Sequence, residues 1–320
     1  NSKLNIDAVL ISNGNNMRYI SGFAGETGYV YISGNRHAVI TDFRYTYQAE
    51  AEAEGYEIVT IGSGGYEEAI GNLIKSDNVK RLGFESEDML FSDYEKLKNA
   101  LDFAELVPIK DEITRLRRIK TPKELERIRI AESIGDKVFS EILNFIKPGV
   151  TELEVAARIE YLLKLYGGEK TSFPAIVASG VNSSMPHAVP TSKKIEKGDF
   201  VTMDFGCVYE GYCSDMTRTI VVGKATDKQK EIYNIVLEAQ LAALDTLRAG
   251  LKGKDVDKVA RDIIYNAGYE GCFGHGLGHS VGLFIHENPR LSATEEDIIE
   301  AGMVETVEPG IYIRGFGGVR

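Results

Sequence analysis

The sequence predicts an α/β chain in two domains, a small α/β domain over residues 1–115 and a larger mixed domain over 116–320. Three observations lead to this prediction. Short β-branched and aromatic runs alternate with helical patterns through the first domain. A strongly charged passage, 110–123, then ends in a helix-start signal. The second domain contains two similar helical segments, which indicate an internal repeat.

The elements of the first domain follow from local patterns. Residues 27–33 and 36–42 flank Gly34-Asn35, a two-residue turn signal, so we expect a β-hairpin there. The other elements continue an alternation that is typical of a small α/β domain. Strands are expected at 7–12, 56–61, 81–86 and 105–109, and helices at 44–54 and near 92–101.

A long helix is predicted to open the second domain. Thr121 is a typical N-cap and Pro122 fits the first helical position, so the helix begins near 122. It ends near 146, before Lys147-Pro148-Gly149. We therefore place the domain boundary near 110–120.

Two segments farther on resemble each other. TELEVAARI (151–159) and KDVDKVARD (254–262) align without gaps at an offset of 103 residues. Each follows a long helix and a glycine-containing turn, Pro148-Gly149 in the first case and Ala249-Gly250 in the second. The matched flanks favour a duplicated α/β unit over coincidence.

Composition and charge exclude several functional classes. The chain of 320 residues is 43% hydrophobic and 27% charged, as expected for a globular protein. A net charge of −11 argues against binding to nucleic acid or to an acidic membrane surface. No apolar run approaches the roughly 20 residues that span a bilayer. The N-terminus lacks a signal-peptide pattern, and three cysteines without CxxC spacing suggest reduced thiols, so we expect a cytoplasmic protein.

Two aspartates are predicted to face each other in a hairpin. FVTMDFGCVYEGYCSDMTRTIVV (200–222) reads as two apolar strands, and placing 208 opposite 211 also places Asp204 opposite Asp215. Directly opposed side chains lie about 5 Å apart. Two ionised aspartates at that distance would repel each other without a cation, which favours a divalent metal. The alternative is that one aspartate caps a loop and the other pairs with Arg218.

Histidines and a glutamate add nitrogen and oxygen ligands. GHGLGHSVGLFIHENP (274–289) holds three of the five histidines, and its four glycines allow the backbone to turn and approach closely. A fourth histidine, His187, lies between two prolines. Glu308 ends an apolar strand before a Pro-Gly turn, whereas Glu305 belongs to the other strand face and is the weaker candidate.

Together these motifs resemble a known family. MDFGxxxxGYxSDxTRT, GHGLGHxxGLxxHExP and VxTxEPGxY, in this order, are similar to the motifs of the pita-bread metallopeptidases, which include methionine aminopeptidases, aminopeptidase P and prolidase, with creatinase as a metal-free relative. NNMRYISGF (15–23) and TDFRY (41–45) resemble the N-terminal domain of the proline-specific branch. The resemblance implies a creatinase/prolidase-type α/β domain followed by a pita-bread catalytic domain with an internal pseudo-two-fold repeat.

The resemblance also implies an activity and a site. It implies hydrolysis of the Xaa-Pro bond at the N-terminus of dipeptides or short peptides by water activated by two divalent metal ions. The ions would be Mn²⁺ or Co²⁺, with Zn²⁺ or Fe²⁺ as alternatives, and the protein would be a homodimer. The positions that match metal ligands are Asp204, Asp215, His279 and Glu308. The positions that match catalytic and substrate-facing residues are His187, His275, His286 and Arg320.

One departure and three rivals remain. The family has a fifth ligand, a glutamate two residues after the matching arginine, whereas this sequence stops at GFGGVR, so we expect a chain truncated at its C-terminus. Creatinase-type hydrolysis is disfavoured by the four occupied ligand positions. Methionine aminopeptidase activity is disfavoured by the N-terminal domain. A non-catalytic scaffold is the third alternative, and sensitivity of an activity to chelators would separate it from an enzyme.

Overall fold

A computed structural model describes residues 4–320 of the chain. The chain divides into two compact units, and the division falls between Arg117 and Arg118.

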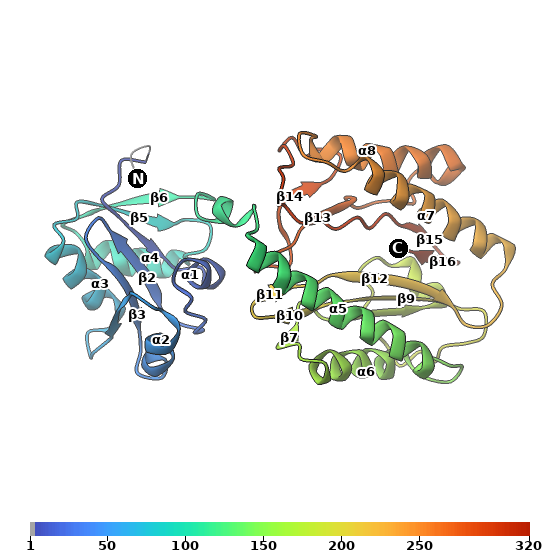
Figure 1. The fold of residues 1–320 in the computed structure, drawn as a ribbon, viewed down its shortest axis with the longest axis horizontal. Helices are drawn as coiled ribbons and strands as arrows, with labels where there is room; N and C mark the ends of the chain where they lie inside the picture. Colours follow the sequence, from blue (N-terminus) through green and yellow to red (C-terminus); the bar gives the residue numbers. More distant parts are fainter. Residues whose placement is uncertain (1–3) are drawn as a thin grey trace. The chain divides into compact units, whose positions relative to one another are not determined.

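The N-terminal unit contains one six-stranded sheet with the strand order β4-β3-β2-β1-β5-β6 (Figure 1). The strands β2 and β3 form the predicted hairpin, in which the Ser33 N–H donates to the Arg36 carbonyl across the turn. β1 pairs in parallel with β5, so the sheet is mixed. Its strands are β1 (Ala8–Ile11), β2 (Tyr29–Ser33), β3 (His37–Thr41), β4 (Glu57–Thr60), β5 (Arg81–Glu85) and β6 (Glu105–Ile109).

Helices cover both faces of this sheet. They are α1 (Gly14–Ser21), α2 (Thr46–Glu52), α3 (Gly65–Ser76) and α4 (Phe91–Ala100). Because successive strand residues point to opposite faces, two separate cores form. Leu10 packs with α3 and α4 in one core, and Ile11 packs with α1 and α2 in the other. A short 3₁₀ helix, Thr114–Arg117, ends the unit.

The C-terminal unit begins with the predicted long helix, α5 (Pro122–Phe145). The Thr121 hydroxyl accepts from the Glu124 N–H, and the Glu124 carboxylate accepts from the Thr121 N–H, so the helix start is a complete capping box. The helix α6 (Glu152–Leu165) starts with the same arrangement at Thr151. These caps fix where both helices begin, and the start of α5 lies where the sequence predicts.

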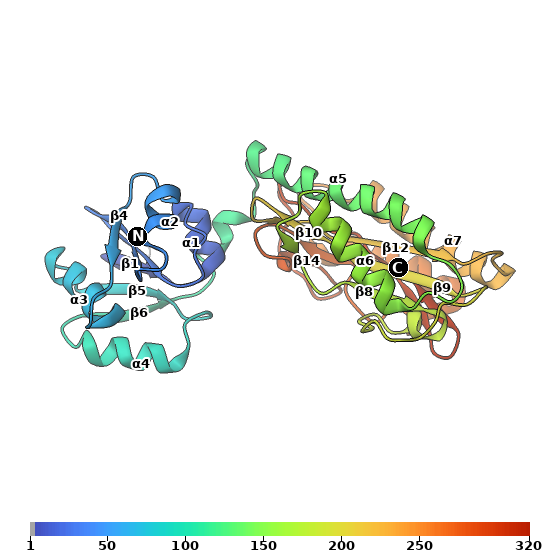
Figure 2. The ribbon, with the colours of Figure 1, turned by 90° about the horizontal axis from the view of Figure 1, so that it is seen from below.

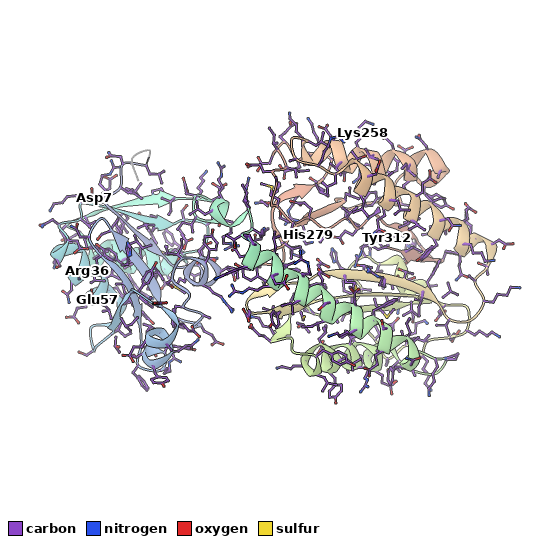
Figure 3. The ribbon with its side chains drawn as sticks, in the orientation of Figure 1. Asp7, Arg36, Glu57, Lys258, His279 and Tyr312 are labelled. Atoms are coloured by element: carbon purple, nitrogen blue, oxygen red, sulfur yellow. The ribbon has the colours of Figure 1, made fainter. Side chains whose placement is uncertain are left out.

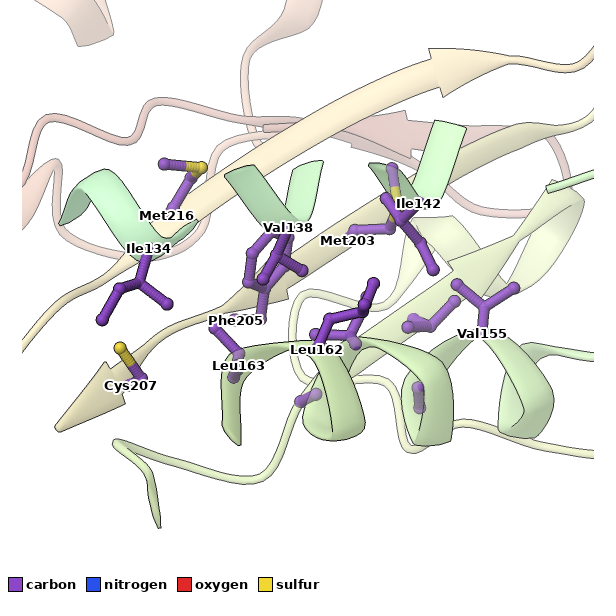
Figure 4. Packing of buried hydrophobic residues seen from close by; sticks show 14 of the residues in the cluster. Ile134, Val138, Ile142, Val155, Leu162, Leu163, Met203, Phe205, Cys207 and Met216 are labelled. Carbon is purple, nitrogen blue, oxygen red and sulfur yellow. The ribbon is translucent and has the colours of Figure 1, made fainter. Parts of the chain in front are cut away.

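The helices α5 and α6 lie across a three-stranded sheet with the order β12-β9-β8 (Figure 2). Val138 of α5, Leu162 of α6 and Phe205 of β9 meet in the core between them (Figure 4). The strands of this half are β7 (Lys170–Thr171), β8 (Ile176–Ser179), β9 (Phe200–Phe205), β10 (Cys207–Tyr209), β11 (Tyr212–Cys213) and β12 (Met216–Val221), with a 3₁₀ helix at Gly180–Ser184.

The second half of this unit repeats the plan of a helix pair over short strands. The helices are α7 (Asp227–Thr246) and α8 (Gly253–Ile264), which continues into a π-helical turn, Tyr265–Tyr269. The strands are β13 (Gly278–Ser280), β14 (Glu287–Leu291), β15 (Ile311–Ile313) and β16 (Gly317–Val319). This half has its own buried core, and in Figure 1 the strands lie between α7–α8 and α5–α6.

The internal repeat has a different offset from the sequence alignment. Val155 of α6 and Val256 of α8 occupy equivalent buried positions, and so do Ile159 and Ala260, which gives an offset of 101 residues (155 to 256) instead of 103. The glycine turns before the two helices share this offset. In the sequence alignment, the matched Ala-Arg pairs are two residues away from the structural equivalence, because short helical motifs recur by chance. The buried positions show which residues of α6 and α8 actually pack in equivalent places.

The predicted register of the aspartate hairpin is wrong by two residues. Asp204 faces Thr217, not Asp215, and Tyr209 faces Tyr212. The turn therefore consists of Glu210 and Gly211, whose φ angles are 44° and 87°. A two-residue hairpin turn of this type needs positive φ at both central positions, which glycine adopts readily. Because the shift is an even number of residues, it does not move Asp204 to the other face.

Candidate metal centre

The eight site residues predicted from the sequence come together around one cavity of the C-terminal unit, with a volume of about 550 Å³. Figure 3 marks one of them, His279, in the strand layer of this unit. The cavity wall includes Asp204, Asp215, His279, Glu308, His187, His275, His286 and Arg320. Four chain segments that are distant in the sequence therefore contribute to a single site. Glu305, the weaker candidate, does not line the cavity and is half-buried.

Three of these residues form a compact ligand set. One potential ligand atom from each of Asp215, His279 and Glu308 lies within 4.8 Å of the other two. The His279 Nε2 is 3.3 Å from Asp215 Oδ2 and 3.4 Å from Glu308 Oε1. Asp215 lies just before β12, His279 lies on β13, and the Glu308 N–H donates to the Leu277 carbonyl beside that strand. Oxygen and imidazole ligands of this kind suit divalent transition metals.

The tautomer of His279 points its free nitrogen at the carboxylates. Its Nδ1 lies 3.0 Å from the Ser280 carbonyl oxygen, which only accepts, so Nδ1 carries the proton. The Nε2 lone pair then faces Asp215 and Glu308. A lone pair against two carboxylates is repulsive without a cation between them. A metal ion, or a proton in its absence, relieves this repulsion.

Asp204 lies on the same cavity wall but has a different partner. Its Oδ2 accepts from the Arg320 guanidinium, while its Oδ1 is buried without a hydrogen-bond partner. Arg320 also donates to Thr217 Oγ1 (2.8 Å), and its Nε is 3.6 Å from Glu308 Oε2. The buried, unpartnered oxygen of Asp204 is the feature expected of a ligand that faces a cation.

Burial and mutual repulsion perturb the acids of this cavity. Burial, opposed by Arg320 and reinforced by Asp215 and Glu308, raises the pKa of Asp204 to about 7. Burial and the nearby Asp215 also raise the pKa of Glu308. Burial alone would lower the pKa of His279, but Asp215 and Glu308 outweigh it and raise this pKa. The site therefore holds more negative charge than it can keep ionised without a cation, and the residues present fit divalent metal ions.

Glycine beside His279 permits close approach of the backbone. A Cβ atom at Gly278 would lie 1.9 Å from the carbonyl oxygen of Thr306. The segment that contains Thr306 and Glu308 runs directly beside β13, and the Thr306 N–H donates to the His279 carbonyl. A larger residue at 278 would push Glu308 away from His279. This packing accounts for one of the glycines in the histidine-rich segment.

His275 has no free ring nitrogen. Its Nδ1 lies 2.7 Å from the Gly276 carbonyl and so carries the proton, which leaves Nε2 to accept from the Tyr312 hydroxyl at 2.9 Å. Burial lowers the pKa of His275 to about 4, so its ring is neutral. Figure 3 shows Tyr312 in the same strand layer as His279. His275 therefore orients Tyr312. The sequence did not predict this contact.

Buried acids fix the segments that carry two of the cavity histidines. Glu152, at the start of α6, accepts from the Ser179 and Thr191 N–H groups, which lie on either side of the segment with His187. Asp257 of α8 accepts from the Leu277 N–H and binds Arg261, which donates to the His275 carbonyl. In both halves, the second helix of the pair thus anchors a histidine-bearing segment.

The change Glu152→Gln is expected to lower the stability of the C-terminal unit by about 1–3 kcal/mol, because an amide nitrogen would replace an oxygen that accepts hydrogen bonds in a buried site. Thermal unfolding of the variant measures this loss. Glu160→Gln, at an exposed position of the same helix, is the matched control and should unfold like the parent. Equal unfolding temperatures for both variants would contradict the anchoring role of Glu152.

Two further residues near the cavity carried no distinctive signal in the sequence. Glu132 of α5 accepts from the Asp215 N–H at 3.0 Å, and burial raises its pKa to about 7. Arg290 of β14 lines the cavity beside the histidine-rich segment. Glutamate and arginine are common residues, and both of these lie in segments with many other charges. Their positions in the sequence therefore did not distinguish them from charged residues on the surface.

Comparisons with known proteins agree with this geometry. Residues 126–320 match the model of "Metallopeptidase family M24", and residues 2–119 match the "Creatinase/Prolidase N-terminal domain". The chain is 45% identical to the uncharacterized peptidase YqhT of Bacillus subtilis, over 99% of this chain and 90% of the relative. It is 42% identical to an Xaa-Pro dipeptidase of Pyrococcus horikoshii, over 99% of this chain and 89% of the relative.

A solved structure is also similar over the whole chain. The structure of an Xaa-Pro dipeptidase from Bacillus anthracis is 47% identical in sequence and superimposes with a TM-score of 0.96. The match covers 100% of this chain and 89% of the dipeptidase.

Proposed function

The chain belongs to the metallopeptidase family M24, and from that premise we propose that it is an Xaa-Pro dipeptidase or aminopeptidase. The family membership and the pita-bread fold with a creatinase-type N-terminal domain confirm the expectation from the sequence motifs. The observation that carries the proposal is the Nε2 lone pair of His279 facing two carboxylates in a cavity lined by three further imidazoles. A scaffold protein would have no need of this costly arrangement of buried charge.

Four residues would hold the metal. We assign Asp204, Asp215, His279 and Glu308 as ligands of two divalent ions, with Mn²⁺ or Co²⁺ preferred for this oxygen-rich set. When bound, such ions supply Lewis acidity and lower the pKa of water toward about 7. Arg320 would favour the ionised form of Asp204, because its guanidinium donates to that carboxylate.

The other polar residues of the cavity would orient the substrate. His286 and His187 are solvent-accessible in the cavity wall and can donate to a carbonyl or a carboxylate. His275 would act through Tyr312. The negative charge of the site attracts a free N-terminal amine, and Phe173, Pro174 and Val189 supply an apolar wall against which a proline ring can pack.

Arg290 would favour dipeptides. It lines the cavity with an exposed side chain, and a C-terminal carboxylate there would gain a charge-assisted hydrogen bond. Arg290→Met is expected to raise the KM for Ala-Pro by about tenfold, since a hydrogen bond to a charged group contributes about 1.5–3 kcal/mol. The KM for Ala-Pro-NH₂, which lacks the carboxylate, should change little. Equal losses on the two substrates would contradict this role.

A homodimer and a cytoplasmic location complete the proposal and rest on the resemblance to the family and on composition. Among the described residues, no helix combines the length and the apolarity needed to cross a membrane.

The direct test is hydrolysis of Ala-Pro and Ala-Pro-Ala by the full-length gene product, with Mn²⁺ added and then removed by a chelator. Release of alanine that stops on chelation is the expected result, and the preferred peptide distinguishes dipeptidase from aminopeptidase. Failure to cleave either peptide in the metal-loaded protein would reject the proposal and favour a scaffold.

A further inference from the structure

A buried ion pair lies next to the histidine that faces the substrate. Lys120 Nζ is 3.2 Å from Glu287 Oε2, and the two side chains are 1% and 2% exposed. Glu287 directly follows His286 and begins β14. The ring of His286 lies 4.5 Å from that of His279, measured between centroids. A fully buried pair this close to the site needs an explanation beyond stability, because burial of two charges contributes little net stability.

Lys120 is held rigidly by its surroundings. Its N–H donates to the Gly302 carbonyl at 2.9 Å, and its Nζ also donates to the Arg118 carbonyl at 3.2 Å. The next residue, Thr121, is the N-cap of α5. The ammonium group is therefore a fixed point to which the segment that carries His286 can be attached.

Glu287 in turn holds the loop that carries His286. Its Oε1 accepts from the Phe284 N–H at 3.2 Å, and a Cβ at Gly282 would lie 2.6 Å from its Oε2. The carboxylate thus lies close to Gly282 and accepts a hydrogen bond from the backbone of Phe284. Without the ammonium group of Lys120, this carboxylate would lose a buried charged partner and could move.

We propose that Lys120 is a positioning residue that, through Glu287, fixes the imidazole of His286 in the cavity. The inference rests on the proposed function for its kinetic consequence only. It extends the pattern of Glu152 and Asp257, which anchor the segments of His187 and His275. For His286, the anchor is an ion pair whose cation comes from the segment just before α5.

The test is Lys120→Met, which keeps the length of the side chain and removes its charge. We expect the kcat for Ala-Pro to fall about 10–100-fold with Mn²⁺ binding unchanged, since small displacements of a positioned group have effects of this size. The double variant Lys120→Met/His286→Ala should be no slower than His286→Ala alone, because Lys120 acts through His286. Lys120→Met/Glu287→Gln should recover part of the loss, since the carboxylate that has lost its buried cation is then neutral.

Two controls separate positioning from general damage. Lys123→Met changes an exposed lysine nearby and should leave kcat unchanged. Ile142→Ala lowers stability in the core between α5 and α6 and should reduce the unfolding temperature without lowering kcat at 25 °C. Additive losses in the Lys120/His286 double variant would overturn the proposal, because they would show two independent effects.

A second readout does not need activity. In ¹H–¹⁵N spectra of the side-chain imidazoles, Lys120→Met should shift or broaden the His286 signals and leave those of His187 and His275 in place. If the parent protein cleaves neither peptide, the proposed function fails while these spectra still decide the positioning role. Unchanged His286 signals would overturn that role whatever the activity.

Discussion

The change Asp215→Asn is expected to lower the kcat for Ala-Pro by on the order of 10³-fold and to remove most of the bound metal. Asp215 interacts with every other proposed ligand. Its carboxylate lies 3.3 Å from the His279 ring, and its charge raises the pKa of both Asp204 and Glu308. Loss of a group that only supports a metal ligand costs about 10–100-fold in affinity or activity, so loss of a charged ligand should cost more.

The asparagine variant isolates charge from shape. The side chains have the same size, and the Asp215 N–H that donates to Glu132 is retained. Metal content measured by mass spectrometry and kcat measured with excess Mn²⁺ give the two readouts. Asp245→Asn, at an exposed position of α7, is the control and should behave like the parent. An Asp215→Asn variant with full metal content and normal kcat would remove Asp215 from the ligand set.

The sequence predicted most of the fold because its strongest signals are local. The Gly34-Asn35 turn and the Thr121-Pro122 helix start depend on residues close in the chain, and both are present as predicted. The helices α1 and α3 were not predicted. Their cores come from contacts with strands far along the chain, and a helix such as Gly14–Ser21 is too short to show a clear period.

The errors share one physical cause. The repeat offset and the hairpin register were each wrong by two residues, because apolar patterns with periods near 2 or 3.6 fit several alignments almost equally well. The positive φ angles of Glu210 and Gly211 fix the hairpin register, and the burial of Val155 and Val256 fixes the repeat offset. Neither is visible in a single sequence.

The sequence predicted the site residues with distinctive chemistry and missed the residues that position them. Histidines and aspartates in apolar strands are rare enough to be conspicuous. Lys120, Glu132 and Tyr312 are of common types, and only the tertiary structure shows that they contact Glu287, Asp215 and His275. Roles that depend on a partner elsewhere in the chain leave no local pattern.

Removal of metal should make stability fall as pH rises, which is the reverse of the usual behaviour of paired carboxylates. Burial raises the pKa of Asp204 from 3.8 to about 7, and burial likewise raises the pKa of Glu305 from 4.5 to about 7. Between about pH 4 and 7 the folded, metal-free protein therefore holds protons that the unfolded chain has released. The free energy of unfolding decreases with pH wherever the folded state binds more protons.

Two histidines act in the opposite direction but do not cancel this effect, since burial lowers the pKa of His286 as well as that of His275. Burial lowers the pKa of His275 from 6.5 to about 4, so its neutral ring stabilises the fold increasingly as pH rises over that range. Glu132, whose pKa burial also raises to about 7, joins Asp204 and Glu305 on the other side. Burial also raises the pKa of Glu308, so four carboxyl groups oppose two imidazoles and stability falls between pH 5 and pH 8.

Divalent metal should reverse the trend, because it binds the ionised carboxylates in place of protons. At a free metal concentration of 100 times Kd, the stabilisation is about 2.7 kcal/mol, or roughly 5–10 °C for a unit of this size. Unfolding temperatures with Mn²⁺ and with chelator, at pH 5 and pH 8, measure both effects. The gain from Mn²⁺ should be larger at pH 8 and nearly absent in Asp215→Asn. A chelated protein that becomes more stable from pH 5 to pH 8 would show that these acids are ionised without metal, and the electrostatic basis of the metal centre would then be wrong.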